Sequence, residues 1–530
     1  MTSWLTTEYS KLNNYGFLAL IIDASTVDHA WRLVSDAVLY GEHFHAVPLQ
    51  NMFFRHSDVA AETVRHSPDV DAGAARFELA HEGFTYRDQF VLTDGEGHQH
   101  RIVCVMQKNQ RDETPVPCPA CRSSQIAGNS YPTLGVKSWE CLNVLCPDRS
   151  IYNRGKRYSF KAILAQEAIE HPSNEIPVDN VRRWQKDVLA FQDDSEIVET
   201  LVRHYSITGD GVWLDPSLTA AKAVAVPGRV NHVLEGHAFD PRGDDSFWDG
   251  PLFARTTSKP RPPATTSRPP LGEELWRVEE GDAREVLAGI AGDSIDRAIT
   301  SPPYFNAREY SQWPNLYCYV HDMQAVAREV FRVLKPGSYY AYNIFDTFDN
   351  ERTITFSDMG KKRISLSSWS IDAFGRLGFE LAGNLVWDKG DIHGKRGFNA
   401  GNFSPFYQSP FNCWEHVLLF RKPGGRRSEA MHQVGRSVSR IHPVVKMIKG
   451  KNTHGHTAPF PLELPLRLMS GLAPGSVVLD PFGGSGTTAR AALSVGLRAL
   501  MVEQDPAYAA LSRRLIAEED RPLWTEQSVL

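Results

Sequence analysis

The sequence predicts an α/β protein whose C-terminal half forms a mostly parallel, seven-stranded sheet with helices on both faces. First, apolar strand candidates alternate with helical patterns along this half, as a parallel sheet requires. Second, two polar segments rich in Gly or Pro, 300–304 and 480–488, each directly follow a predicted strand. Third, the N-terminal half has weaker, mixed patterns and a group of four cysteines, which indicates a separate mixed α/β region.

The seven strands are predicted from short apolar runs bounded by turn residues. They cover 275–280, 296–300, 337–345, 381–388, 414–421, 476–480 and 498–503. Helices are predicted at 282–290, 321–334, 366–377, 487–496 and 505–518. The helix at 321–334 has the clearest pattern, because Met323, Val326 and Val330 recur near helical spacing before a Lys-Pro-Gly stop signal.

Length and composition narrow the class of protein. A chain of 530 residues is too long for a single hydrophobic core. No run of about 18 apolar residues occurs, and the N-terminus lacks the basic-then-apolar layout of a signal peptide. The sequence therefore predicts a cytoplasmic protein without membrane spans. Because the formal net charge is −6, any binding of nucleic acid must use local basic patches.

A proline-rich segment at 255–272 divides the chain. It has five prolines and almost no large apolar side chain, so we expect an extended, exposed linker. The predicted division is an N-terminal mixed domain (1–114), a cysteine module (115–162), a helical or mixed region (163–254), the linker, and a C-terminal α/β domain (273–530).

The segment Asp-Pro-Phe-Gly-Gly-Ser-Gly-Thr-Thr at 480–488 is typical of a loop that binds a nucleotide-like cofactor. Its glycines allow a tight turn and let a ligand approach the backbone. The N–H groups of the helix that follows suit a carboxylate or a hydroxyl oxygen. Glu503 ends the next predicted strand, where an acid suits the hydroxyls of a ribose.

The segment Ser301-Pro302-Pro303-Tyr304 indicates a pocket for a flat substrate. Two prolines hold the backbone extended and aim its carbonyl oxygens in one direction. Ser301 adds a hydroxyl and Tyr304 a flat ring. A planar base can lie on that ring with its exocyclic amine facing the oxygens.

Together, and in this order along the chain, the two segments resemble the amino-methyltransferases of DNA, in the permuted (beta) class whose catalytic motif precedes its cofactor motif. The resemblance covers about residues 272–530. It implies a Rossmann-like methyltransferase sheet, S-adenosyl-L-methionine as cofactor and double-stranded DNA as substrate. The residues that it assigns to the cofactor are Asp282, His456, Pro459, Asp480, Phe482, Gly484, Gly486, Thr487 and Glu503. Those that it assigns to catalysis are Ser301, Pro302, Pro303 and Tyr304.

The expected chemistry follows from the weak nucleophilicity of an exocyclic amine, whose lone pair is drawn into the ring. Acceptors on the amine hydrogens stabilise the positive charge that develops on nitrogen, and held alignment can lower a barrier by roughly 7–11 kcal/mol. The base must leave the duplex to reach such a pocket. In this family a Ser-Pro-Pro-Tyr tetrad usually accompanies the N4 amine of cytosine, which we therefore prefer. The alternatives are the N6 amine of adenine and a non-catalytic DNA-binding or recruitment protein.

Four of the seven cysteines predict a structural zinc site. Cys118 and Cys121 form one short pair, and Cys141 and Cys146 form another, which is the spacing of a zinc ribbon with all four positions filled by protein. A chance grouping or a redox pair is the alternative.

Basic residues near the catalytic segments predict contact with DNA. The resemblance places target recognition in an insert at about 389–455, although a solvated basic loop is the alternative. A cognate nuclease or another defence-system protein is a candidate partner, as in restriction–modification. The residues predicted to contact DNA are Arg308, Arg426, Arg427, Arg436, Arg440, Lys446, Lys449 and Lys451.

Overall fold

The computed structural model places most of the chain. It describes residues 4–13, 16–50, 77–109, 117–128, 138–150, 152, 155, 157–159, 171–184, 186–191, 193–217, 224–234, 240, 242, 245–254, 256–260, 267–305, 311–313, 316–348, 363–390, 413–444, 447–448, 451–452 and 461–519. No helix within these ranges is both long and apolar enough to cross a bilayer.

The C-terminal half is built on one eight-stranded sheet in the order β11-β22-β21-β12-β13-β17-β16-β18. The five strands from β11 to β13 are parallel to one another. Within this sheet β17 runs against both of its neighbours, and β18 is parallel to β16. The strands are β11 (Trp276–Glu280), β12 (Ile295–Thr300), β13 (Leu334–Ile344), β16 (Glu380–Asp388), β17 (Trp414–Arg421), β18 (Val438–Arg440), β21 (Val477–Asp480) and β22 (Arg498–Glu503).

The prediction of a seven-stranded sheet is wrong by one strand. Each of the seven predicted segments forms a strand, with shifts at its ends. The eighth strand, β18, is a three-residue segment within the predicted basic insert. Its residues have no alternating apolar pattern, so only pairing with β16 makes it a strand.

Helices cover both faces of this sheet, and the alternation of side chains along β13 shows how. Tyr340 and Tyr342 pack on one face with α9, α10 and α11, whereas Tyr339 and Ala341 pack on the other with α12, α13, α14 and α15. The helices are α9 (Ala283–Ala288), α10 (Leu316–Val333), α11 (Leu366–Gly375), α12 (Glu429–Arg436), α13 (Glu463–Leu468), α14 (Thr487–Ser494) and α15 (Pro506–Glu519).

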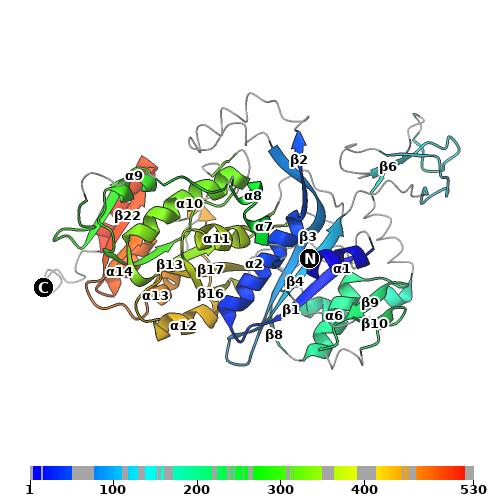
Figure 1. The fold of residues 1–530 in the computed structure, drawn as a ribbon, viewed down its shortest axis with the longest axis horizontal. Coiled ribbons are helices and arrows are strands. Elements are labelled where there is room, and N and C mark those ends of the chain that lie inside the picture. The colour runs from blue at the N-terminus through cyan, green and yellow to red at the C-terminus, as the bar shows by residue number, and fades with distance from the viewer. Residues whose placement is uncertain are drawn as a thin grey trace, which may run out of the picture.

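The N-terminal region forms a second sheet in the order β1-β4-β3-β2, and β8 pairs with β3. The long helix α2 lies between this sheet and the C-terminal sheet (Figure 1), and it contacts both β3 and β16. The elements are α1 (Trp4–Lys11), β1 (Phe17–Asp23), α2 (Val27–His43), β2 (His45–Gln50), β3 (Phe77–Thr93), β4 (Gln99–Asn109) and β8 (Val188–Ala190).

Buried polar contacts join the two sheets. The Trp31 indole donates to Gln99 Oε1 at 2.7 Å, and Gln99 Nε2 donates to the carbonyl of Asn384 in β16 at 2.6 Å. Trp31 and Trp414 also belong to one apolar cluster that spans both halves. The N-terminal sheet therefore shares a core with the C-terminal half.

The remaining described elements are short apart from the helix α6. They are β5 (Ile126–Gly128), β6 (Ser138–Cys141), β7 (Arg157–Ser159), the 3₁₀ helix η2 (Pro172–Asn174), α5 (Val178–Arg183), α6 (Asp194–Tyr205), β9 (Gly211–Leu214), β10 (Val230–Val233), α7 (Asp245–Trp248), α8 (Pro251–Ala254), β14 (Thr347–Phe348), β15 (Arg363–Ile364), β19 (Met447–Ile448) and β20 (Lys451–Asn452).

The predicted linker is not exposed at its start. Thr256 and Ser258 are buried, and the Ser258 N–H donates to Gln324 Oε1 of α10 at 2.7 Å. Arg328 of α10 donates to Ser258 Oγ at 2.6 Å. Hydrogen bonds to α10 thus hold the start of the linker, which its composition alone predicts to be exposed. Residues 261–266 of the linker lie outside the described ranges.

Candidate functional site

The two segments singled out by the sequence lie at the same edge of the sheet. They follow β12 and β21, which are adjacent and parallel, with Ala298 opposite Leu479. Thr300 Oγ1 donates to Asp480 Oδ1 at 2.6 Å, across 180 residues of chain. The carboxyl ends of neighbouring parallel strands form the usual ligand site of such sheets.

Asp480 is the centre of the glycine-rich loop (residues 480–488). Its carboxyl group accepts from the Thr300 hydroxyl, from the N–H of Phe482 at 3.0 Å and from the Thr488 hydroxyl at 2.6 Å. Burial raises the pKa of Asp480 to about 6, although these donors oppose the shift. Asp480 therefore holds the loop in shape and ties it to β12.

Two glycines give this loop its tight curvature. Gly484 and Gly486 have φ values of +52° and +80°, which side-chain-bearing residues rarely adopt. A Cβ on Gly486 would lie 2.6 Å from Ser512 Oγ of α15. The loop thus turns directly into α14 and packs closely against α15 at Gly486, where there is no room for a side chain.

Glu503 lies where the sequence predicts an acid for ribose hydroxyls. One carboxylate oxygen accepts from the N–H of Gly484 at 2.7 Å and the other from the N–H of Asp505 at 2.9 Å. Burial raises its pKa. Each oxygen keeps acceptor capacity for a further donor, so a half-buried Glu503 beside the glycines fits a cofactor with ribose hydroxyls.

The other predicted cofactor residues fall into two groups. Asp282 lies at the same sheet edge, where it caps α9 and pairs with Arg284, while the neighbouring Gly281 donates to the carbonyl of Glu503 at 3.0 Å. In the loop itself Phe482 is half-buried and Thr487 is buried. His456 and Pro459 lie outside the described residues.

The Tyr304 hydroxyl lies at the centre of a second polar cluster. It is 3.1 Å from Ser301 Oγ, 3.1 Å from Asn343 Oδ1 and 2.9 Å from Glu415 Oε2. Burial, and then the charge of Glu415, raise the pKa of Tyr304 well above its usual value. The Tyr304 ring meets Phe345 edge-on, at 4.6 Å between centroids. The tyrosine is therefore held both at its hydroxyl and at its ring.

Three residues of this cluster were missed by the sequence analysis: Asn343, Lys389 and Glu415. Asn343 is near the end of β13, Lys389 follows β16, and Glu415 is near the start of β17. Because β17 runs antiparallel to both, its first residues meet their last ones. The sequence signal that could have indicated these three residues is the presence of polar side chains at the ends of apolar strand candidates.

Glu415 gathers the donors of this cluster. The Lys389 ammonium pairs with Glu415 Oε1, and Asn343 Nδ2 donates to Glu415 Oε2 at 2.8 Å. Glu415 is 6% exposed, so the pair is shielded from water. A buried carboxylate is tolerated when donors satisfy it in this way.

The predicted DNA-binding residues are divided between two edges of the sheet. Arg440 is exposed and lies opposite Asp388 in register, at the edge that holds Glu415 and Lys389. Arg426 and Arg427 follow the far end of β17, and Arg427 lies 3.8 Å from Glu380. They therefore lie away from the Tyr304 cluster.

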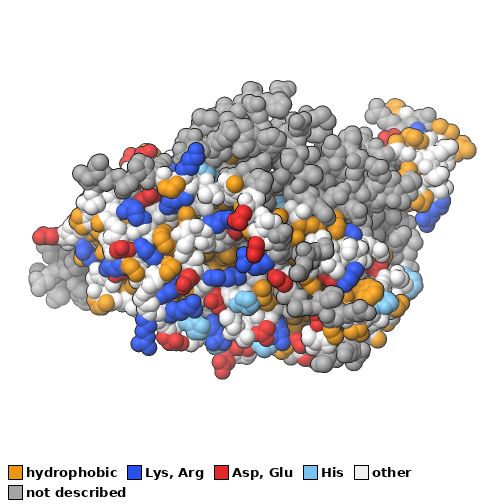
Figure 2. Space-filling model, in the orientation of Figure 1, with side chains coloured by type: hydrophobic (Ala, Val, Ile, Leu, Met, Phe, Trp, Pro, Cys, Tyr) orange, Lys and Arg blue, Asp and Glu red, His pale blue; other side chains and the backbone are white. Residues whose placement is uncertain are grey.

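The rest of the predicted basic surface is less well placed. Arg436 is half-buried at the end of α12. Lys and Arg side chains on the face in Figure 2 are interspersed with Asp and Glu. Arg308, Lys446 and Lys449 lie outside the described residues, and Lys451 is described by its backbone alone.

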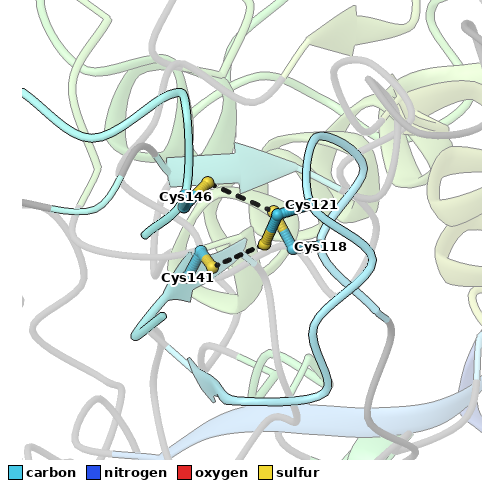
Figure 3. Close-up of side chains that lie close together, drawn as sticks. All are labelled: Cys118, Cys121, Cys141 and Cys146. Atoms are coloured by element: carbon cyan, nitrogen blue, oxygen red, sulfur yellow. Dashed lines mark hydrogen bonds between the residues drawn. The ribbon is translucent and has the colours of Figure 1, made fainter. Parts of the chain in front are cut away.

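The four predicted zinc ligands come together (Figure 3). Their Sγ atoms all lie within 4.8 Å of one another. Two of the contacts are 3.8 Å, between Cys118 and Cys146, and 3.6 Å, between Cys121 and Cys141. A tetrahedron with Zn–S bonds of about 2.3 Å has S···S edges of about 3.8 Å. The donor set and its spacing therefore fit one tetrahedral zinc ion.

Comparison with known proteins connects these features. Residues 295–514 match the family model described as DNA methylase. The chain is 36% identical over 481 residues to the type II beta methyltransferase M.BslI of Bacillus sp. (strain NEB-606), covering 83% of this chain and 53% of that protein. It thus spans about half the length of M.BslI.

Two further similarities each cover less than half of this chain. The type II methyltransferase M.BglI of Bacillus subtilis is 27% identical over 293 residues, covering 44% of this chain and 84% of that protein. TTHA0409 of Thermus thermophilus, crystallised with S-adenosyl-L-methionine, is 30% identical, with a TM-score of 0.35, over 46% of this chain and 96% of that one.

Proposed function

Because this chain belongs to the beta-class DNA amino-methyltransferases, we propose that it transfers a methyl group from S-adenosyl-L-methionine to an exocyclic amine in double-stranded DNA. One observation carries the proposal. The Thr300–Asp480 hydrogen bond joins the end of the base-side strand to the start of the cofactor loop. A methyl donor at residues 480–488 and a base at residues 301–304 are thereby brought to one sheet edge.

The residues of the glycine-rich loop hold the cofactor in this proposal. Gly484 and Gly486, with their positive φ values, shape the tight turn around it, Glu503 accepts from ribose hydroxyls, and Phe482 lies beside it. Asp480 does not contact the cofactor in this proposal. It fixes the conformation of the loop by accepting hydrogen bonds from Thr300, Phe482 and Thr488. When bound, S-adenosyl-L-methionine supplies an electrophilic methyl group on a sulfonium.

Residues 301–304, which form the base side of the site, make the weakly nucleophilic exocyclic amine reactive in this proposal. The Ser301 hydroxyl and the Pro302 carbonyl accept from the amine hydrogens and so stabilise positive charge on nitrogen. Pro303 keeps the backbone extended, and Tyr304 anchors the segment through its hydroxyl. The base is extruded from the duplex to reach them.

We propose cytosine N4 as the target, because Ser301 opens the tetrad and resembles the cytosine-specific members. Adenine N6 is the alternative. Purified protein, unmethylated genomic DNA and S-adenosyl-L-methionine with a labelled methyl group form the test, followed by hydrolysis and identification of the labelled nucleoside. N4-methylcytosine is expected, and Ser301→Ala is expected to lose transfer by about 100-fold or more. N6-methyladenine would establish the alternative.

The non-catalytic alternative has its own outcome in the same experiment. A protein that binds DNA and the cofactor but labels no unmethylated genomic DNA would be a recognition or recruitment protein. If the protein does transfer methyl groups, DNA sequencing that detects modified bases, on cells with and without the protein, would give the target sequence.

For the cysteine module we propose one structural zinc ion held by Cys118, Cys121, Cys141 and Cys146. All four coordination positions are filled by protein, so the ion stabilises the fold of the module and takes no part in transfer. Metal analysis of the purified protein should find one zinc per chain, and Cys121→Ser should lower that content. Absence of zinc from protein purified without chelator would overturn this assignment.

We propose that DNA lies against the edge that carries Arg440, together with the basic insert, because Arg440 shares that edge with Lys389 and Glu415. Arg440→Ala should weaken DNA binding, and Arg427→Ala, at the far end of β17, should leave it nearly unchanged. Since the relatives are type II methyltransferases, a role in restriction–modification with a cognate nuclease is part of the proposal.

A further inference from the structure

We infer that Glu415 is a positioning residue that sets the direction of the hydrogen bonds through Tyr304 to Ser301, so that the Ser301 oxygen faces the target amine as an acceptor. The inference rests on the proposed function. It starts from a chain of contacts in which Glu415 Oε2 lies 2.9 Å from Tyr304 Oη, and Tyr304 Oη lies 3.1 Å from Ser301 Oγ.

Tyr304 has one hydroxyl proton and three oxygens that could accept it, and the third is Ser301 Oγ at 3.1 Å. Glu415 Oε2, at 2.9 Å, is nearer than Asn343 Oδ1, at 3.1 Å, and carries charge. Charge-assisted hydrogen bonds are shorter and about twice as strong as neutral ones. The proton of Tyr304 therefore points to Glu415, and the lone pairs of Tyr304 Oη remain for Ser301.

The consequence for Ser301 follows from its hydroxyl inventory. A serine hydroxyl has one proton and two lone pairs. When Tyr304 Oη accepts the Ser301 proton, both lone pairs of Ser301 Oγ are left for donors from outside. An exocyclic amine brings N–H donors, so it meets an acceptor and not a competing O–H.

The surroundings of Glu415 keep this direction fixed. Lys389 pairs with Oε1, and Asn343 Nδ2 donates to Oε2 and also to the carbonyl of His416, at 3.0 Å. These donors come from the ends of two different strands. Neither donor group can accept a proton from Glu415, so they hold it as the acceptor of the cluster.

The test is a double-mutant cycle between Glu415 and Tyr304. Single-turnover methyl transfer is measured at saturating DNA and S-adenosyl-L-methionine for the wild type, Glu415→Gln, Tyr304→Phe and the double variant. Gln keeps the shape but can also donate, so Glu415→Gln should slow transfer by about 10- to 100-fold. Because Glu415 acts through the Tyr304 hydroxyl, the double variant should be no slower than the slower single variant.

Two controls separate positioning from a loss of structure. Glu380→Gln removes a carboxylate that pairs with Arg421 in the same sheet at 2.9 Å, away from Tyr304, and should leave the rate unchanged. Glu415→Gln combined with Lys389→Met removes the unpaired ammonium and should not restore the rate. Affinity for the cofactor should stay the same in all variants. A wild-type rate for Glu415→Gln, or equal slowing by it with and without the Tyr304 hydroxyl, would overturn the inference.

Neutron diffraction from perdeuterated crystals gives a readout that needs no turnover. The deuteron of Tyr304 should point to Glu415, and that of Ser301 to Tyr304. A Ser301 deuteron directed away from Tyr304 would refute the inference even if the enzyme is active. If the wild type labels no DNA, the proposed function fails, while the neutron maps still decide the direction of these bonds.

Discussion

The two sides of the site are built over different distances along the chain. On the cofactor side, Asp480 bonds to Phe482 and Thr488, two and eight residues away, and Gly484 bonds to Glu503, nineteen residues away. On the base side, Tyr304 bonds to residues 39 and 111 positions away. The cofactor side is a local motif, whereas the base side is an assembly of strand ends.

This difference governs how each side responds to change. A local loop depends on backbone conformation, so its weak points are glycines and the buried acid that closes the turn. The assembled side depends on the pairing of buried charges, such as Lys389 with Glu415. The Thr300–Asp480 bond is a direct polar link between the two sides.

The largest effect is expected from Gly486→Ala, which attacks the local side. Its φ of +80° is strained for alanine, and the new Cβ would lie 2.6 Å from Ser512 Oγ. Strain and overpacking together should lower the free energy of unfolding by about 2–5 kcal/mol and abolish cofactor binding. Gly475→Ala is the matched control, because φ is +79° there and no atom lies within 4 Å. Equal losses in both variants, by denaturant unfolding and calorimetric titration, would show that the contact with α15 is unimportant.

The next effect tests the assembled side through pH. Burial lowers the pKa of His416 from 6.5 to about 4. Between these values the unfolded chain binds a proton that the folded chain does not, so stability is lost as pH falls from about 6.5 to 4. The loss is at most about 3 kcal/mol. His416→Asn, which keeps an acceptor for Asn384, should flatten this acid loss in unfolding curves measured across the window. An unchanged slope would contradict the assignment.

Asp480 on the local side should show the opposite slope. Its folded pKa is raised to about 6 from 3.8, so the folded chain holds a proton that the unfolded chain lacks between those values. Stability should therefore fall as pH rises from about 4 to 6, by at most about 3 kcal/mol. Asp480→Asn should remove that slope, and the same unfolding curves check it. The same fall in the variant would assign the slope to another group.

The smallest effect concerns the link between the sides. Thr300→Val removes the hydroxyl that donates to Asp480 at 2.6 Å and should lower the free energy of unfolding by about 1–3 kcal/mol. Transfer should fall more than cofactor affinity, since the loop keeps its own bonds. Thr300→Ser retains the hydroxyl and serves as the control. If Thr300→Ser loses as much transfer as Thr300→Val, the hydroxyl is not the link.

The same contrast explains what could be predicted. The glycine-rich loop, Glu503, the Ser301–Tyr304 segment and the four cysteines have short spacings, and the structure brings each set together where the sequence placed it. No local sequence pattern marks Asn343, Lys389 and Glu415, because they come together only when particular strands become neighbours in the sheet. The same holds for Arg426 and Arg427, which the direction of β17 carries to the far edge of the sheet.

Local sequence patterns specify the alternation of strands and helices, the two motifs, their order and the cysteine pairs, because periodicity and turn chemistry act over a few residues. The assembled fold was needed to show that β17 runs antiparallel between β13 and β16, which brings Glu415 to Tyr304. It was also needed to show that α2 packs the N-terminal sheet against the C-terminal half. Strand neighbours and buried charge pairs are chosen by the burial of whole faces, which no short stretch of sequence encodes.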